Sequence, residues 1–200
     1  FLGWNPGTDK EMFTLAELIE TFSLERVGHS GAKYDYKKTM WFNQQHLRLK
    51  SDQDIFDAIV KIDDTVLNSF SKDYILSVIS LVKDRAVFDK DILQEASCFF
   101  SQDVEYDAPA VKKKWDSLLV PTLNKLLNKL AALDSFKNNE IEKIFQLHLK
   151  DENVSIGKIM PMLRIAITGK LAGPSMFDTM QLLGLEQTRI RVLNAIKQLS

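Results

Sequence analysis

Arg164 stands alone in an apolar run that leads into a short turn rich in glycine and proline. The stretch, residues 163–184, reads LRIAITGKLAGPSMFDTMQLLG. Arginine presents a planar fork of donors that fits a base edge or a phosphate. The turn and the residues after it contribute five further candidates: Lys170, Gly173, Pro174, Met176 and Phe177. Close backbone approach at the turn, apolar stacking surface and an arginine are the means by which proteins hold splayed RNA bases.

Packing alone also explains this pattern, with Phe177 in the core and Arg164 paired with an acid such as Asp178. A second basic feature is the run Lys112 to Lys114 beside Trp115, which fits either a solvated helix face or a phosphate contact. Basic residues also gather near the C-terminal end of the chain, against few acids: Arg164, Lys170, Arg189, Arg191 and Lys197.

The sequence offers no catalytic constellation. The three histidines have no metal-ligand spacing, and Cys98 lies in the apolar context EASCFF, which favours an inert buried thiol. The segment TGKLAG departs from a phosphate-binding loop, because Arg164 stands where glycine is needed and Leu171 where serine or threonine is needed. We therefore expect no catalytic residue, metal or cofactor in this chain.

Composition describes an ordinary globular protein rather than a bulk polyelectrolyte. The 200 residues are 45% hydrophobic and 26% charged, with a formal net charge of -1. Nucleic-acid binding would therefore need a local basic patch. A single cysteine excludes an intrachain disulfide, and no apolar run has the length of a membrane span. Because the chain begins Phe-Leu-Gly-Trp without methionine, we expect a piece of a longer protein.

Helical patterns dominate, so the predicted fold class is all-α. Thr14 and Glu17 form a capping box, and Asp107 before Pro109 is a strong helix start. We also expect Asp73 to cap a helix over 74–85, Asp89 to cap one over 91–99, and a pattern running to 132 with a break at Pro121. Gly169 is the expected C′ residue of a helix over 155–168, and Gly184 ends the next. Polar breaks in the apolar period predict boundaries at 68–72 and 102–107.

The same stretch that contains Arg164 resembles the last part of the bacterial-type glutamyl-tRNA synthetases. The family pattern L-R-x-A-[LI]-T-G-x-x-x-x-P-x-[LM]-F-[DE] is met from Leu163 to Asp178. The beginning of the chain, FLGWNPGTDKEMFTLAELIETFSLERVGHSGAKYDYKKTMWFNQQHLR, is similar to the family as well. The two matches cover about a third of the chain, and their order and spacing place the middle in the same family.

This resemblance implies a tRNA-binding half without the catalytic domain. Residues 1–70 would form a helical stem-contact region, and 71–200 an all-helical anticodon-binding domain with a break near 102–107. The implied partner is tRNA(Glu), in a cytoplasmic, monomeric parent that uses ATP and Mg to attach glutamate. No membrane, no DNA and no cofactor of this piece are implied. Alone, the piece would be inactive.

The resemblance also assigns residues. Arg164 corresponds to an arginine beside the anticodon; Gly173, Pro174 and Met176 correspond to the turn that packs on anticodon bases, with Phe177 supporting it from behind. Arg85, in LVKDRAVFDKDI, resembles the arginine that discriminates the third anticodon base. It would favour restriction to glutamate anticodons over an enzyme that also charges glutamine tRNA. Candidate contacts to the RNA backbone are Lys112, Lys113, Lys170 and Arg48.

Two other classes of function compete with this reading. A helical protein-interaction module without an RNA role would show no salt-dependent tRNA binding and no positive face around Arg85 and Arg164. A self-contained enzyme is disfavoured because the sequence has no nucleophile, metal site or nucleotide loop.

Overall fold

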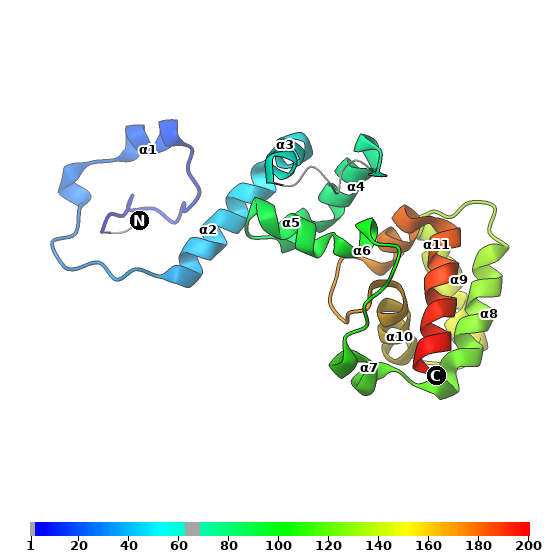
Figure 1. The fold of residues 1–200 in the computed structure, drawn as a ribbon. Helices are drawn as coiled ribbons and strands as arrows, with labels where there is room; N and C mark the ends of the chain where they lie inside the picture. The colour runs from blue at the N-terminus through cyan, green and yellow to red at the C-terminus, as the bar shows by residue number, and fades with distance from the viewer. Residues whose placement is uncertain (1–2, 63–68) are drawn as a thin grey trace.

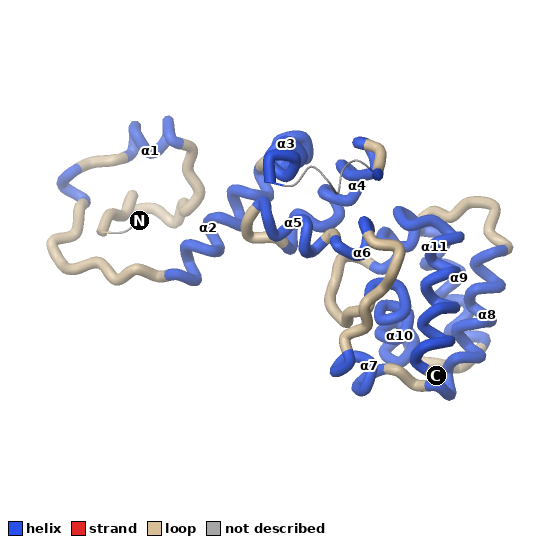
Figure 2. Tube along the Cα trace, viewed as in Figure 1, coloured by secondary structure: helices blue, strands red, loops and turns tan. Residues whose placement is uncertain are grey.

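A computed structural model describes residues 3–62 and 69–200, and within these ranges the chain consists of helices and loops (Figures 1 and 2). The helices are α1 Leu15–Thr21, α2 Tyr36–Leu49, α3 Asp52–Ile62, α4 Lys72–Val82, α5 Asp89–Glu95, α6 Ser97–Phe100, α7 Ala108–Lys114, α8 Val120–Ala131, α9 Asn138–Asp151, α10 Ile156–Thr168 and α11 Met176–Leu199. Short 3-10 turns accompany them: η1 Leu24–Arg26, η3 Lys83–Arg85 and η4 Ser117–Leu119. The all-α prediction is confirmed; the described residues hold one isolated bridge, between Trp4 and Val27.

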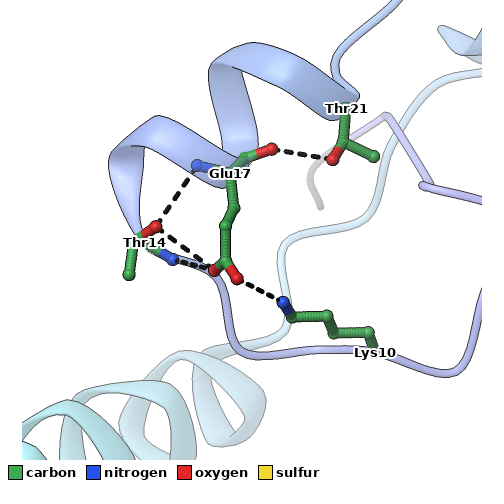
Figure 3. A network of polar contacts seen from close by, with 4 residues as sticks. All are labelled: Lys10, Thr14, Glu17 and Thr21. Carbon is green, nitrogen blue, oxygen red and sulfur yellow. Dashed lines mark hydrogen bonds and ion pairs between the residues drawn. The ribbon is translucent and has the colours of Figure 1, made fainter.

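Helix α1 begins with the predicted capping box (Figure 3). The Glu17 amide donates to the Thr14 hydroxyl over 3.2 Å, and the Thr14 amide donates to the Glu17 carboxylate over 2.8 Å. Lys10 adds an ion pair to Glu17 of 2.7 Å. This network satisfies donors that the first turn of a helix leaves free. None of the residues of α1 is buried, so its local hydrogen bonds are the main support of this helix.

Other helix starts differ from the sequence-based expectation. Ser71, not Asp73, caps α4, because its hydroxyl accepts from the amide of Tyr74. Helix α5 begins at Asp89 itself, two residues before the expected start. The capping carboxylate is instead that of Asp91, which accepts from the amides before the helix. At both starts the capping side chain lies two residues from the expected one.

In the second half of the chain, glycines and prolines mark where helices begin, end or kink. The expected pattern from 108 to 132 divides into α7 and α8, and Pro121 lies in the first turn of α8, where its missing amide costs nothing. Gly169 ends α10 with φ 76°, as its C′ position requires. Gly184, at φ 79° and ψ 166°, kinks α11 where a helix end was predicted.

Two buried clusters hold the helices together. The first core cluster comprises buried residues of α2 to α6, from Leu47 to Phe99. The second core cluster comprises buried residues of α8 to α11, from Leu123 to Ala195. Leu183 packs against both, and in Figure 1 α6 lies where the two groups of helices meet. Residues 102–107 lie in the loop between α6 and α7, and the subdomain break expected there stays a prediction.

The predicted boundary at residue 70 stays a prediction. Residues 63–68, including Asn68 and the acidic pair Asp63 and Asp64, lie outside the described part of the chain. On either side, α3 packs against α4 and α5, so the first core cluster contains residues from both sides of position 70.

Candidate nucleic-acid interface

The turn between α10 and α11 is fixed by a backbone contact that only glycine permits. A Cβ on Gly169 would lie 1.9 Å from the carbonyl oxygen of Glu105. The amide of Asp107 also donates to the Gly169 carbonyl over 2.9 Å. The loop that links the two core clusters is therefore attached directly to the start of the turn.

Arg164 faces this turn and bonds to its backbone. Its Nη1 donates to the carbonyl of Pro174 over 2.9 Å, and a Cβ on Gly173 would approach the same nitrogen to 2.9 Å. The guanidinium therefore packs against a bare stretch of backbone. The alternative pairing with Asp178 is not formed, because that carboxylate accepts instead from the amide group of Asn138 over 2.6 Å.

Pro174 and Met176 of the turn point into the protein, whereas Leu171 is exposed. Pro174 is buried, and Met176 is only 3% exposed in the second core cluster. Phe177 is half-buried, with its ring 5.5 Å from that of Phe145, and its expected support of the turn stays a prediction. The expected stacking surface of Met176 is thus used for packing, and the exposed side chain of the turn with a charge is Lys170.

Arg85 ends the 3-10 turn that follows α4, and α2 holds that turn. Asn43 donates to the carbonyl of Val87, and Gln44 and Arg48 donate to the carbonyl of Asp84, the latter over 2.9 Å. Arg85 itself is exposed and bonds through Nε to the carboxylate of Glu95 over 3.0 Å. Arg48, a candidate for an RNA backbone contact, is thereby engaged with the turn that carries Arg85.

Arg85 and Arg164 lie close enough to interact electrostatically, although they come from different core clusters. Burial lowers the pKa of the Arg164 guanidinium, and the positive charge of Arg85 lowers it further. Among the described residues, Arg164 has no ion pair with a carboxylate. Two arginines that repel each other form a place where an anion or an electron-rich base edge is favoured.

Lys112 and Lys113 are exposed in the last turn of α7, which packs against α10. Lys170 is exposed beyond the end of α10. Within residues 3–62 and 69–200, none of these three lysines forms an ion pair with a carboxylate. Exposed lysines without a carboxylate partner can attract phosphates, and the expected contacts of these three to the RNA backbone stay a prediction.

A family profile described as "Anticodon binding domain" matches residues 37–196. The chain belongs to this family. It is 35% identical to the glutamate–tRNA ligase of Amoebophilus asiaticus, over 98% of this chain and 38% of that protein, and 36% identical to that of Bacteroides fragilis, over 99% and 39%. The crystal structure of a glutamate tRNA ligase from Elizabethkingia meningosepticum matches with a TM-score of 0.86 and 33% identity, over 100% of this chain and 39% of that one. The chain thus spans about two fifths of the relatives' length, and corresponds to their C-terminal anticodon-binding region.

One functional arrangement in this anticodon-binding domain escaped the sequence analysis. Arg191, expected among the basic residues around the turn, is 2% exposed and donates to three backbone carbonyls. A signal was present in the spacing, because the buried positions of this part of α11 are Thr188, Arg191, Val192 and Ala195. That i, i+3, i+4, i+7 stripe faces the core. Arg189 and Lys197 lie off it and are exposed.

The groups considered for catalysis have other surroundings in this domain. Burial raises the pKa of the Cys98 thiol, which disfavours the reactive thiolate. His148 is buried, with Nε2 donating to the Thr122 carbonyl over 2.9 Å. The described residues contain no group of three or more histidine, cysteine, aspartate or glutamate side chains that could hold a metal ion. None of their helices is long and apolar enough to cross a membrane.

Proposed function

We propose that this chain binds the anticodon loop of tRNA(Glu) as part of a glutamate–tRNA ligase. The observation that supports it most is that Arg85 lies close enough to Arg164 for its charge to lower the Arg164 pKa, while each guanidinium makes its hydrogen bond within the described residues through one nitrogen and keeps others for a base or phosphate. Arg164 is held by a backbone carbonyl and Arg85 by the exposed carboxylate of Glu95, so Arg164 is fixed and Arg85 is partly oriented before RNA arrives. Such preorganisation lowers the entropy lost on binding.

The proposed interface has two kinds of residue. Arg85 and Arg164 read bases, with Arg85 at the third anticodon position, which favours glutamate anticodons over those of glutamine. Lys112, Lys113 and Lys170 contribute phosphate affinity that depends on salt and not on sequence. Gly173, Pro174, Met176 and Phe177 hold the turn against Arg164; whether their backbone also touches a base stays a prediction.

The catalytic part of the proposed enzyme lies outside this chain. The parent ligase would use ATP and Mg in the cytoplasm as a monomer, and this chain alone would not attach glutamate. Residues 1–70 would reach the tRNA stem, and 71–200 the anticodon.

The decisive experiment measures binding of this chain to a glutamate tRNA transcript at two salt concentrations, beside a transcript with a changed third anticodon base. Arg85→Ala should remove roughly 1–3 kcal/mol of preference for the native base. Lys112→Ala should weaken binding to both transcripts equally. It should also reduce the slope of the logarithm of the binding constant against the logarithm of salt concentration by about one. Equal behaviour of the two variants would contradict the division of roles. Absence of salt-dependent binding by the unmodified chain would contradict the proposal.

The competing class is a helical protein-interaction module. Its main support is α1, where Leu15 and Ile19 are 76% and 71% exposed. That apolar face lies far along the chain from the two arginines and can coexist with RNA binding. The competing class has no RNA role and predicts no salt-dependent tRNA binding, so the tRNA measurement separates the two classes.

A further inference from the structure

Arg191 is a buried cation without a carboxylate partner among the described residues. Its Nη1 donates to the Ile167 carbonyl over 2.9 Å, and its Nη2 donates to the carbonyls of Cys98 and Ser101, each over 2.7 Å. Nε is buried and has no hydrogen-bond partner. Burying a guanidinium in this way is costly, and an apolar side chain would fill the same space more cheaply.

The three acceptors belong to both core clusters. Cys98 and Ser101 lie on and just after α6, the last helix of the first core cluster, whereas Ile167 lies in the last turn of α10 in the second. Carbonyls at helix ends lack intrahelical partners and carry partial negative charge, so they suit a cation. One side chain therefore connects the ends of two helices that are about seventy residues apart in sequence.

The hydrogen bonds of Arg191 between the two core clusters are directional, whereas apolar contacts between the clusters are not. Leu183 packs against both clusters, but apolar contact tolerates sliding and rotation. A planar guanidinium that meets three carbonyls accepts one geometry. Arg85 is carried by the first core cluster and Arg164 by the second, so the orientation fixed by Arg191 also fixes the separation of the two arginines.

We propose that Arg191 is a positioning residue that holds the two core clusters in the one orientation in which Arg85 and Arg164 face the same anticodon loop. The inference rests on the proposed function for its consequence on RNA, but the fixed orientation stands independently of it.

The test measures two quantities separately, the distance between the two core clusters and the preference for the native third anticodon base. Spin labels on Gln94→Cys of α5 and Lys143→Cys of α9, both exposed positions, report the spacing of the clusters in the full 200-residue chain. The native cysteine is removed as Cys98→Ala, which keeps the backbone carbonyl that Arg191 uses. Arg191→Met should broaden or shift the distance distribution, and Arg191→Lys should restore part of it. Arg189→Met, an exposed arginine of the same helix, should leave the distance unchanged.

The same variants are then compared for tRNA binding. Arg191→Met should reduce the preference for the native third anticodon base roughly 2- to 30-fold, the range typical of residues that couple two sites. When Arg85→Ala is already present, adding Arg191→Met should not reduce the anticodon preference any further. An unchanged distance distribution in folded Arg191→Met protein overturns the inference. If the methionine variant does not fold, Arg191→Gln is measured in its place, and an unchanged distribution in that variant overturns the inference equally. If the unmodified chain shows no anticodon preference, the proposed function fails while the distance result still decides the role of Arg191.

Discussion

Arg85 and Arg164 are oriented by different kinds of interaction, an exposed ion pair and a backbone hydrogen bond. Arg164 is half-buried and bonded to a carbonyl of its own turn, with Gly173 leaving room for the guanidinium. Arg85 is exposed and oriented by one carboxylate, that of Glu95. Backbone packing is insensitive to salt, whereas exposed ion pairs are weak and screened. The pair therefore combines a rigid arginine with an adjustable one, and substitutions around each should have different consequences.

The largest effect is expected at the base of the rigid turn. Gly169→Ala must adopt φ 76° and place Cβ 1.9 Å from the Glu105 carbonyl oxygen, so either the turn or the linking loop has to move. We expect the free energy of unfolding to fall by about 3 kcal/mol, from left-handed strain and overpacking together. Chemical denaturation monitored by circular dichroism measures it.

Gly157→Ala is the matched control, because this glycine lies in the same helix and its added Cβ meets no atom within 4 Å. Removing a helical glycine there should raise stability by about 0.5–1 kcal/mol. A loss at position 169 no greater than the change at position 157 would show that the backbone contact is unimportant.

A smaller effect is expected where the turn meets Arg164. Gly173→Ala brings Cβ to 2.9 Å from Nη1, and the end of a flexible side chain can move away. Stability should fall by about 1 kcal/mol, the value of the hydrogen bond to Pro174 that is lost. Affinity for the glutamate tRNA transcript should fall as well. In an Arg164→Ala background the same substitution should have almost no effect, and Ala172→Ser, at an exposed neighbour, should be silent in both.

At the adjustable arginine, stability and specificity should separate. Glu95→Gln removes the carboxylate that orients Arg85, yet stability should change by less than about 1 kcal/mol because the pair is partly exposed. Loss of a negative charge should tighten tRNA binding, while loss of orientation should reduce the preference for the native third base. Glu186→Gln, at an exposed acid of α11, removes the same charge without touching Arg85. Equal loss of preference in the two variants would contradict an orienting role for Glu95.

Sequence reasoning succeeded where a feature depends on residues close together in the chain. The Thr14 capping box and the left-handed Gly169 each follow from a local pattern. Contacts over long separations were not predictable. The hydrogen bonds from α2 to the turn that carries Arg85 depend on packing within the first core cluster, and the contacts of Arg191 depend on how the two clusters dock. Composition could not distinguish a basic residue that faces solvent from one that faces three carbonyls.

Glu17 provides the smallest and most local test, because its environment combines an ion pair with backbone capping. The hydrogen bond from Lys10 and then that from the Thr14 amide lower the pKa of its carboxyl to about 2 from the ordinary 4.5. A lowered folded-state pKa means that the network contributes fully above pH 4.5, and that the contribution is lost as the pH falls toward 2. Signals of α1 should therefore change in this acidic window in an NMR titration.

Lys10→Met should raise the pKa of Glu17 only part of the way to its ordinary value, because the Thr14 amide still donates to the carboxylate. Lys158→Met removes an exposed lysine of α10 and should leave the titration unchanged. A full return to the ordinary value in Lys10→Met would mean that the ion pair alone holds the carboxylate. Helix α1 would then resemble the adjustable Arg85. A partial return of the Glu17 pKa would mean that the hydrogen bond from the Thr14 amide still lowers it after the ion pair is lost. Helix α1 would then depend on both an exposed ion pair, like Arg85, and a backbone hydrogen bond, like Arg164.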